Sequence, residues 1–142
     1  MPIRNESTRS AYDADAVVRA ITDTISGPLY SCVEYDTDGF RPLYVDDRTI
    51  ELYDDREQMA EHFQRIHTNV HMDFMEITLF KNTLFPVADR VEYMVTAMDF
   101  LKIVRIYVGD DGLFLAVDPD EPVAPIVDAV RSVAGPALKG NS

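Results

Sequence analysis

Residues 101–117 read LKIVRIYVGDDGLFLAV, two apolar runs joined by a turn. The composition of Gly109–Gly112 is typical of a hairpin turn, so the two runs are expected to form antiparallel strands. Both strands are apolar on both faces except at Lys102 and Arg105, which point in opposite directions. A sheet with two apolar faces must be covered on both sides. We therefore expect helices, or a partner subunit, on each face.

Hydrophobic periodicity places the other elements outward from this hairpin. In chain order we expect a helix at 11–26, strands at 29–35 and 40–45, a helix from about 54 to 70, a strand at 91–98, the hairpin strands 101–108 and 113–117, and a helix at 123–133. Ser10 is the predicted N-cap of the first helix, which Gly27 and Pro28 end. Asp54 and Glu57 have the spacing of a capping box at the start of the second helix.

Two parts of the pattern allow more than one interpretation. Pro42 cannot donate to a β-ladder, so its strand is either an edge strand or has an unpaired amide side. Residues 71–85 fit a continued, kinked helix or a strand, and we favour the helix. The whole pattern predicts one α/β domain of the α+β type. It has about five mainly antiparallel strands flanked by helices in the order α-β-β-α-β-β-β-α. We expect it to span 11–134, between flexible ends at 1–10 and 135–142.

The charged residues are strongly biased. The chain has 25 Asp and Glu residues against 13 Lys and Arg, a net charge of -12 over 142 residues. Seventeen of the acids are Asp, and only three of the basic residues are Lys. Such a surface repels itself in dilute buffer, but at 1 M salt the Debye length falls to about 3 Å. The composition therefore predicts a protein adapted to a very salty cytosol.

Other classes of protein are disfavoured by the sequence. The single cysteine, Cys32, excludes an internal disulfide and fits a reducing compartment. No apolar run reaches the roughly 18–20 residues of a membrane helix, and the polar start lacks the apolar region of a signal peptide. The scattered basic residues form no stripe that would bind a phosphate backbone. We expect a cytoplasmic protein without a membrane or nucleic-acid partner.

The element order and the carboxy-terminal third resemble roadblock and profilin-like domains. The features that carry this resemblance are the hairpin at 101–117, the acidic turn Asp118-Pro119-Asp120 and the closing helix. Residues 11–133 also resemble a group of short, acidic, uncharacterised proteins of halophilic archaea, including the pattern Asp-Gly-Phe-x-Pro-Leu-Tyr at Asp38–Tyr44. The roadblock resemblance implies a small dimeric scaffold or a regulator of GTPases or motors. It implies no catalytic residues.

The histidines are the first candidates for site chemistry. His67 and His71 are four residues apart, so on a continuous helix both project from one face, as two metal ligands would. A catalytic metal site needs at least three protein ligands and a structural one four. Solvated imidazoles on an amphipathic helix explain the spacing better, so we expect no metal site.

Three further candidates have simpler structural explanations. Acids at alternate positions from Glu34 precede Gly39 as in a calcium loop, but position twelve is Val45 rather than Glu, so a turn is the better interpretation. Cys32 has no neighbouring histidine to activate it and reads as a small buried residue. The paired acids Asp46-Asp47, Asp54-Asp55 and Asp110-Asp111 all lie at element ends, where turns and caps favour Asp. We expect no catalytic residue and no cofactor.

Lys102 and Arg105 attract attention because a charge on a central strand is costly unless it is paired. Either one of them marks a face left open for a partner, or both reach water from strand ends.

A complete core without a catalytic constellation favours a non-catalytic interaction or regulatory module, which we expect to be a homodimer. The sequence does not decide whether the chain is an enzyme, and we favour a protein without catalytic activity. The alternative is a small-ligand sensor with a pocket between the sheet and the middle helix. Met59, Phe63, Met72, Phe74 and Met75 could line such a pocket, although a plain core explains them as well.

Overall fold

A computed structural model describes residues 2–8 and 12–140, with side chains up to residue 134. The strands are β1 (Ile3–Arg4), β2 (Leu29–Tyr35), β3 (Phe40–Val45), β4 (Tyr93–Ala97), β5 (Lys102–Val108) and β6 (Asp111–Val117). The helices are α1 (Ala14–Thr24), α2 (Asp47–Ile50), α3 (Arg56–Val70), α4 (Asp73–Leu79), the π-helical turn η1 (Phe80–Leu84) and α5 (Val123–Gly140).

The strands form one sheet in the order β1-β3-β2-β6-β5-β4, and every pair is antiparallel. The predicted α+β class, the antiparallel sheet and the flanking helices are confirmed. The predicted number of strands is one too low. The additional strand, β1, pairs with Tyr44 and Val45 at the amino-terminal edge of the sheet. A two-residue strand leaves no periodic pattern, so sequence analysis placed it in a flexible end.

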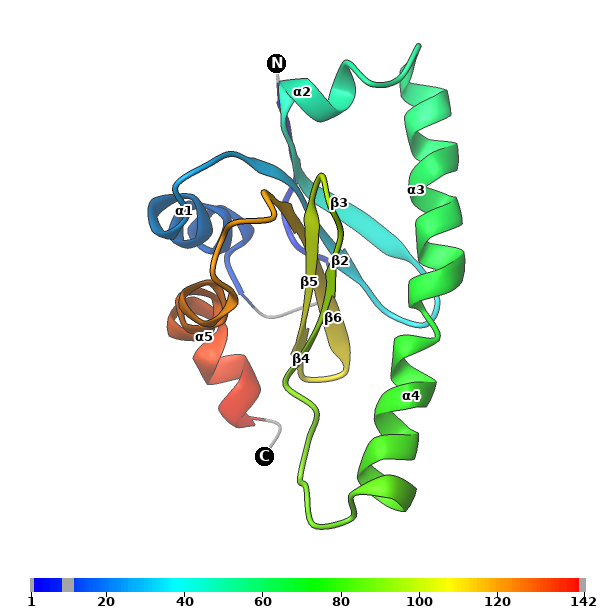
Figure 1. Ribbon diagram of the computed structural model, residues 1–142, viewed down its shortest axis with the longest axis vertical. Helices are drawn as coiled ribbons and strands as arrows, with labels where there is room; N and C mark the ends of the chain where they lie inside the picture. Colours follow the sequence, from blue (N-terminus) through cyan, green and yellow to red (C-terminus); the bar gives the residue numbers. More distant parts are fainter. Residues whose placement is uncertain (1, 9–11, 141–142) are drawn as a thin grey trace.

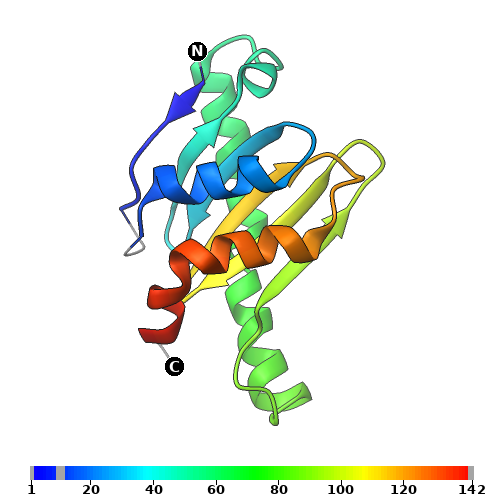
Figure 2. The ribbon, with the colours of Figure 1, turned by 90° about the vertical axis from the view of Figure 1, so that its left-hand side faces the viewer.

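Helices α1 and α5 lie side by side on one face of the sheet (Figures 1 and 2). We call this the closed face. Its seventeen-residue core combines alternate strand residues such as Leu113 and Leu115 with the apolar stripes of both helices, including Ile21 and Ile126. Side chains at i and i+2 point to the same face of a strand, which is why the intervening residues face the other way.

Helix α3 and helix α4 lie on the other side of the sheet (Figure 1). We call this the open face. Its buried cluster is much smaller and consists of Val33, Val45, Met59 and Phe63. The prediction that both faces carry helices is therefore confirmed, but the two faces are covered to different degrees.

Two helix starts differ from the prediction. Asp13, rather than Ser10, caps α1, and its carboxylate accepts from the amides of Asp15 and Ala16 at 2.9 and 3.3 Å. Ser10 lies outside the described residues. At α3 the cap is one residue later than predicted, because Asp55 accepts from the amide of Gln58 at 2.7 Å. Several acids near each start meet the N-cap preference, and the sequence does not choose among them.

Helical structure continues beyond α3, as we favoured for residues 71–85. Helix α4 and the turn η1 extend away from the sheet after a break at His71 and Met72 (Figure 1). The short helix α2 was missed, since Asp46 and Asp47 suggested only the end of a strand. Asp46 instead caps this helix, and its Oδ1 accepts from the amide of Thr49 at 2.9 Å.

Two strand details also differ from the simple pattern. Strand β3 is second from the edge, and β1 covers only its last two residues, so Pro42 lies beyond the β1 pairing. In β2 the register shifts between Leu29 and Ser31, which puts Leu29 in the closed-face core together with Cys32. Strict alternation along a strand would place Leu29 on the same face as Ser31. The register shift explains the difference, because one extra residue in a strand turns the side chains before it to the opposite face of the sheet.

The last helix is longer than predicted. Its backbone is helical to Gly140, whereas the predicted helix ends at residue 133. The ribbon of α5 bends in its last turns (Figure 2), as expected near a proline within a helix. In the described part of the chain, no helix combines the length and the apolar character needed to cross a bilayer.

Candidate functional site

A cavity of about 680 Å³ lies on the open face, between the sheet and α3. Its floor is formed by side chains of β2, β5 and β6, and its wall by α3. The residues that line it from these elements are Tyr30, Ser31, Val33, Tyr35, Ile103, Arg105, Phe114 and Ala116 on the sheet, and His62, Phe63, Ile66, His67 and Val70 on α3. The volume falls within the roughly 300–1,000 Å³ typical of small-molecule sites.

Two further segments contribute to the lining of the cavity. One consists of Arg48, Thr49, Leu52 and Tyr53, from α2 and the loop that follows it. Thr96 and the turn after β4 complete the lining at the side of the sheet, with Met98, Phe100 and Leu101. The lining is mostly aliphatic and aromatic, with a few polar groups among them, as is usual in ligand pockets.

The polar group of most interest is Arg105, the strand arginine that the sequence singled out. Its Nη1 donates to Asp73 Oδ1 at 2.7 Å, forming an ion pair whose side chains are 16% and 5% exposed. Its Nη2 lies 3.3 Å from Thr96 Oγ1. The Nε–H is buried and has no acceptor among the described residues. Arg105 is therefore paired, but not fully satisfied.

Asp73 receives two more hydrogen bonds at its other oxygen. The hydroxyls of Tyr35 and Tyr107 donate to Oδ2 at 2.8 and 3.0 Å. Phe74, the next residue of α4, packs against both tyrosine rings at centroid distances of 5.5 and 6.1 Å. We call Asp73, Arg105, Tyr35 and Tyr107 the Asp73 cluster. It joins α4 to β2 and β5.

Burial is the largest cause that raises the pKa of Tyr35 and of Tyr107 above the ordinary tyrosine value, and Asp73 raises both further. Both phenols therefore stay protonated at neutral pH and act as hydrogen-bond donors. Gly112 makes room for one of them, because a Cβ there would lie 2.5 Å from ring atoms of Tyr35. These properties suit a structural clamp, and they make neither tyrosine a ready base or nucleophile.

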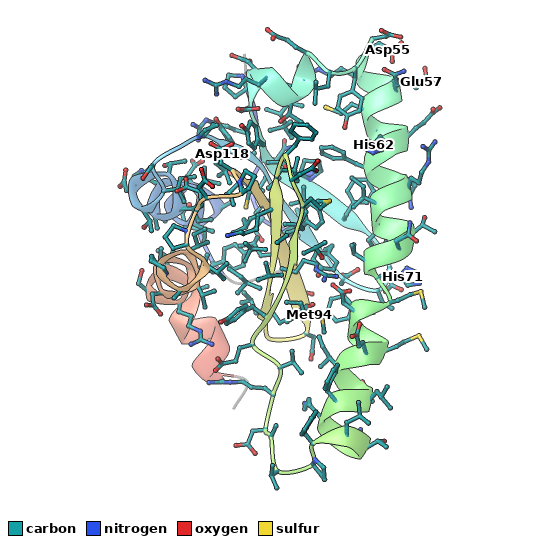
Figure 3. The ribbon with its side chains drawn as sticks, in the orientation of Figure 1. Asp55, Glu57, His62, His71, Met94 and Asp118 are labelled. Carbon is teal, nitrogen blue, oxygen red and sulfur yellow. The ribbon has the colours of Figure 1, made fainter. Side chains whose placement is uncertain are left out.

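The histidines of α3 are engaged separately. His67 Nε2 is 2.8 Å from the carbonyl oxygen of Asp36, and His71 Nδ1 is 3.2 Å from the carbonyl oxygen of His67. His62 Nδ1 is 2.5 Å from the hydroxyl of Tyr53. Figure 3 shows His62 partway along α3 and His71 at its far end. Across residues 2–8 and 12–140, no three ligand-type side chains are grouped to hold a metal ion.

The other candidates have local structural partners. Asp36 Oδ1 accepts from the amides of Asp38 and Gly39 at 2.8 Å each, a side-chain turn of the kind that the sequence suggested over a calcium loop. Cys32 is fully buried in the closed-face core, and burial raises the pKa of its thiol. Of the paired acids, Asp46 and Asp55 cap helices, the latter at the start of α3 (Figure 3).

Of the five residues expected to line a pocket, Phe63 does so. Met59 is buried in the same cluster as Phe63, Met72 and Met75 are exposed, and Phe74 packs in the Asp73 cluster. Sequence analysis missed Tyr35, Tyr107 and the role of Asp73. The available signal was Arg105 itself, because an arginine on a strand with apolar faces needs an acidic partner. The sequence contains 25 acidic residues and does not indicate which of them is that partner.

The comparisons with known proteins support the fold. No protein-family model matches this chain, and no curated protein sequence matches it. Among solved structures, it is similar to a roadblock/LC7 domain from Streptomyces avermitilis. That match has a TM-score of 0.55 and 11% identity, covering 86% of this chain and 92% of that one. It is also similar to the gliding protein MglB from Thermus thermophilus, with a TM-score of 0.56 and 16% identity, covering 98% and 96%.

This chain has a roadblock-like fold. The resemblance drawn from the hairpin and the closing helix is confirmed at the level of fold. At these identities the similarity shows the arrangement of helices and strands. It says nothing about the individual residues of the Asp73 cluster.

Proposed function

We propose that this chain is a non-catalytic interaction or regulatory module that acts as a homodimer in a high-salt cytosol. The observation that carries the proposal is the placement of exposed apolar side chains. Of the eleven large exposed hydrophobic residues in the described chain, ten fall between Met72 and Phe100, and the other is Leu52. Exposed apolar side chains concentrated in one segment of a chain are candidates for an interaction surface.

Strand β4 supplies the geometry for such an interaction. It ends the sheet and pairs only with β5 among the described strands, so its outer edge offers backbone groups to another chain. Tyr93 and Val95 on β4, with Met98 and Phe100 after it, are all exposed, and Phe100 is 85% exposed. We call these four residues the edge surface. Sheet edges that are exposed and apolar pair readily with a second copy.

The Asp73 cluster supports a non-catalytic role. Its carboxylate is committed to three donors, and its tyrosines remain protonated. The roadblock resemblance, with its implied dimeric scaffolds, points the same way. A complete core and a free edge are sufficient for a protein that works by binding another.

The dimer is tested by light scattering on the purified chain in molar potassium chloride. We expect twice the mass of one chain, and a monomer for Val95→Lys, because a charge on the edge strand opposes pairing. Val87→Lys is the matched control, since Val87 is highly exposed but lies in the loop before β4. A monomeric parent protein would overturn the homodimer, and an unchanged mass for Val95→Lys would move the interface away from β4.

The high-salt setting has its own test. With a net charge of -12, self-repulsion should destabilise the fold in dilute buffer and fade as salt screens it. We expect the midpoint of thermal unfolding to rise steadily from about 10 mM to molar potassium chloride. Equal stability across that range would remove the argument for a salt-adapted protein.

The cavity favours one alternative, a small-ligand sensor domain with its pocket between the sheet and the middle helix. A hollow of about 680 Å³ at the position expected for such a pocket supports this alternative. It does not exclude a dimer, since Tyr93 and Val95 of the edge surface are not among the lining residues, although Met98 and Phe100 belong to both.

A further inference from the structure

The charge around the cavity is opposite to that of the protein as a whole. Acidic residues outnumber basic ones 25 to 13 in the sequence. Yet no Asp or Glu is among the residues that line the cavity, whereas Arg48, Arg105, His62 and His67 are. Each arginine is already paired with one carboxylate outside the lining, Arg105 with Asp73 and Arg48 with Asp46. In so acidic a chain, a lining with two arginines and no acid still favours an anion over a cation.

Arg105 is the better placed of the two arginines to bind an anion. Arg48 is 70% exposed at its side chain and pairs with Asp46 at 3.3 Å. Arg105 is largely buried, and Asp73 engages only its Nη1. The Nε–H has no acceptor in the described structure, and the Nη2 contact with Thr96 is long at 3.3 Å. The Nε–H is shielded from the cavity, so Nη2, beside Thr96 in the cavity lining, is the nitrogen that an incoming carboxylate oxygen can engage in a charge-assisted hydrogen bond.

The rest of the cavity suits an apolar body. Phe63 and Ile66 on α3 face Phe114 and Ile103 on the sheet across it. The part of α3 that lines it, residues 62–70, spans about 12 Å at 1.5 Å per residue. If each non-hydrogen atom takes about the 30 Å³ share of a water molecule, the volume holds roughly twenty such atoms. The shape and chemistry fit a chain or ring system with one polar end.

We propose that this cavity binds an apolar molecule that carries a single carboxylate, with the carboxylate at Arg105 and the apolar body along α3. The inference rests on the ligand-sensor alternative and deepens it. The commitment to an anion comes from Arg105 and from the acid-free lining. A neutral ligand would offer Arg105 Nη2 no charged acceptor, and a cation would meet two arginines and no acid in the lining. A second copy of the chain is a less suitable occupant. Its net charge of -12 opposes close approach to this chain, and one of its carboxylates would have to reach Arg105 inside the cavity.

The test uses three ligands of the same chain length and different head groups: sodium octanoate, 1-octanol and octylammonium chloride. Binding to the full chain is measured by calorimetry and by methyl shifts of Met98 and Ile103 in molar potassium chloride. Salt screens a buried ion pair much less than an exposed one. We expect octanoate to bind at least tenfold more tightly than 1-octanol, and octylammonium not to bind.

Variants locate the site. Arg105→Gln should abolish the preference for octanoate over 1-octanol, whereas Arg19→Gln, at an exposed arginine of α1 on the closed face, should leave it unchanged. Because Arg105→Gln also leaves Asp73 without its ion pair, a second variant avoids the Asp73 cluster. Ala116→Leu adds volume at the cavity floor and should weaken octanoate binding at least tenfold.

Each outcome decides between the proposals. Tighter binding of octanoate, lost in both cavity variants, supports the inference. Equal binding of octanoate and 1-octanol overturns the carboxylate assignment and leaves the ligand sensor standing. No binding of any ligand by a dimeric chain overturns the inference and the sensor together, and leaves the homodimeric module. Binding that survives Ala116→Leu would place the ligand elsewhere and overturn the inference.

Discussion

The sheet presents one face to α1 and α5 and the other to α3 and α4, and these faces are held together in different ways. The closed face is filled by seventeen buried residues, nearly all aliphatic. The open face has a buried cluster of four residues, a cavity and the Asp73 cluster. Neighbouring residues of one strand divide between them, with Leu113 and Leu115 on the closed face and Phe114 and Ala116 on the open one.

The difference shows that helices can cover a face of the sheet without their side chains filling the space between helix and sheet. On the closed face, apolar side chains of α1 from Ala14 to Ile21 and of α5 from Ile126 to Ala134 pack against the sheet. On the open face, α4 is attached at its first residue by hydrogen bonds and an ion pair, and α3 borders a hollow. Close packing makes the first face resistant to shape change, while the second has room for another molecule.

The largest effect that would test this comparison is expected at Asp73. Replacing it by Ala leaves Arg105 without its ion pair and two buried hydroxyls without an acceptor. Breaking such a buried pair by removing one partner typically costs about 3–5 kcal/mol. We expect a loss of stability of this size in chemical denaturation. Asp128→Ala, at an exposed acid of α5, is the control and should change stability little. A loss below about 1 kcal/mol would show that the Asp73 cluster does not hold α4.

The next effect compares two isoleucines on β5. Ile106 is 1% exposed on the closed face, and Ile103 lines the cavity on the open face. Ile106→Ala should cost about 2–5 kcal/mol, because it opens a new cavity in a filled core. Ile103→Ala should cost less than half as much, since part of its surface already borders a void. Equal losses, measured by the same denaturation experiment, would mean that both faces are packed alike.

The smallest effect concerns alkaline pH. The raised pKa of Tyr35 means that the folded chain keeps a proton that the unfolded chain loses near pH 10. Its contribution to stability is therefore fully present below about pH 10 and decreases above it. The expected slope is on the order of 1 kcal/mol per pH unit. Tyr35→Phe should be less stable at pH 8 and lose less between pH 10 and 11. A slope identical to that of the parent chain would contradict the burial of this phenol.

Most of the secondary structure could be predicted from the sequence. Strands 29–35 and 40–45 have the predicted bounds, because apolar runs between turn residues leave few alternatives. Elements without a period were missed, namely the two-residue strand β1 and the four-residue helix α2. The N-caps of α1 and α3 were displaced because several nearby acids fit each position.

The candidate site could be predicted only in part. A pocket between the sheet and the middle helix was anticipated as an alternative, and Arg105 was recognised as a charge that needs a partner. The partner, Asp73, is 32 residues away, and Tyr35 is a further 38 residues from Asp73. Four of the five residues expected to line the pocket lie elsewhere. Met59 is in the buried open-face cluster, Met72 and Met75 are exposed, and Phe74 packs in the Asp73 cluster.

By itself, the sequence determined most of the strands and helices, that both faces of the sheet need cover, and that the chain is strongly acidic. These follow from local periodicity and composition, which act over a few residues. Only the tertiary structure decided that α3 borders a cavity, that its lining excludes acids, and that Asp73 meets Arg105. The cavity depends on how far α3 lies from the sheet, and the ion pair depends on which of many acids reaches Arg105. Neither is encoded by the pattern of residues within one segment.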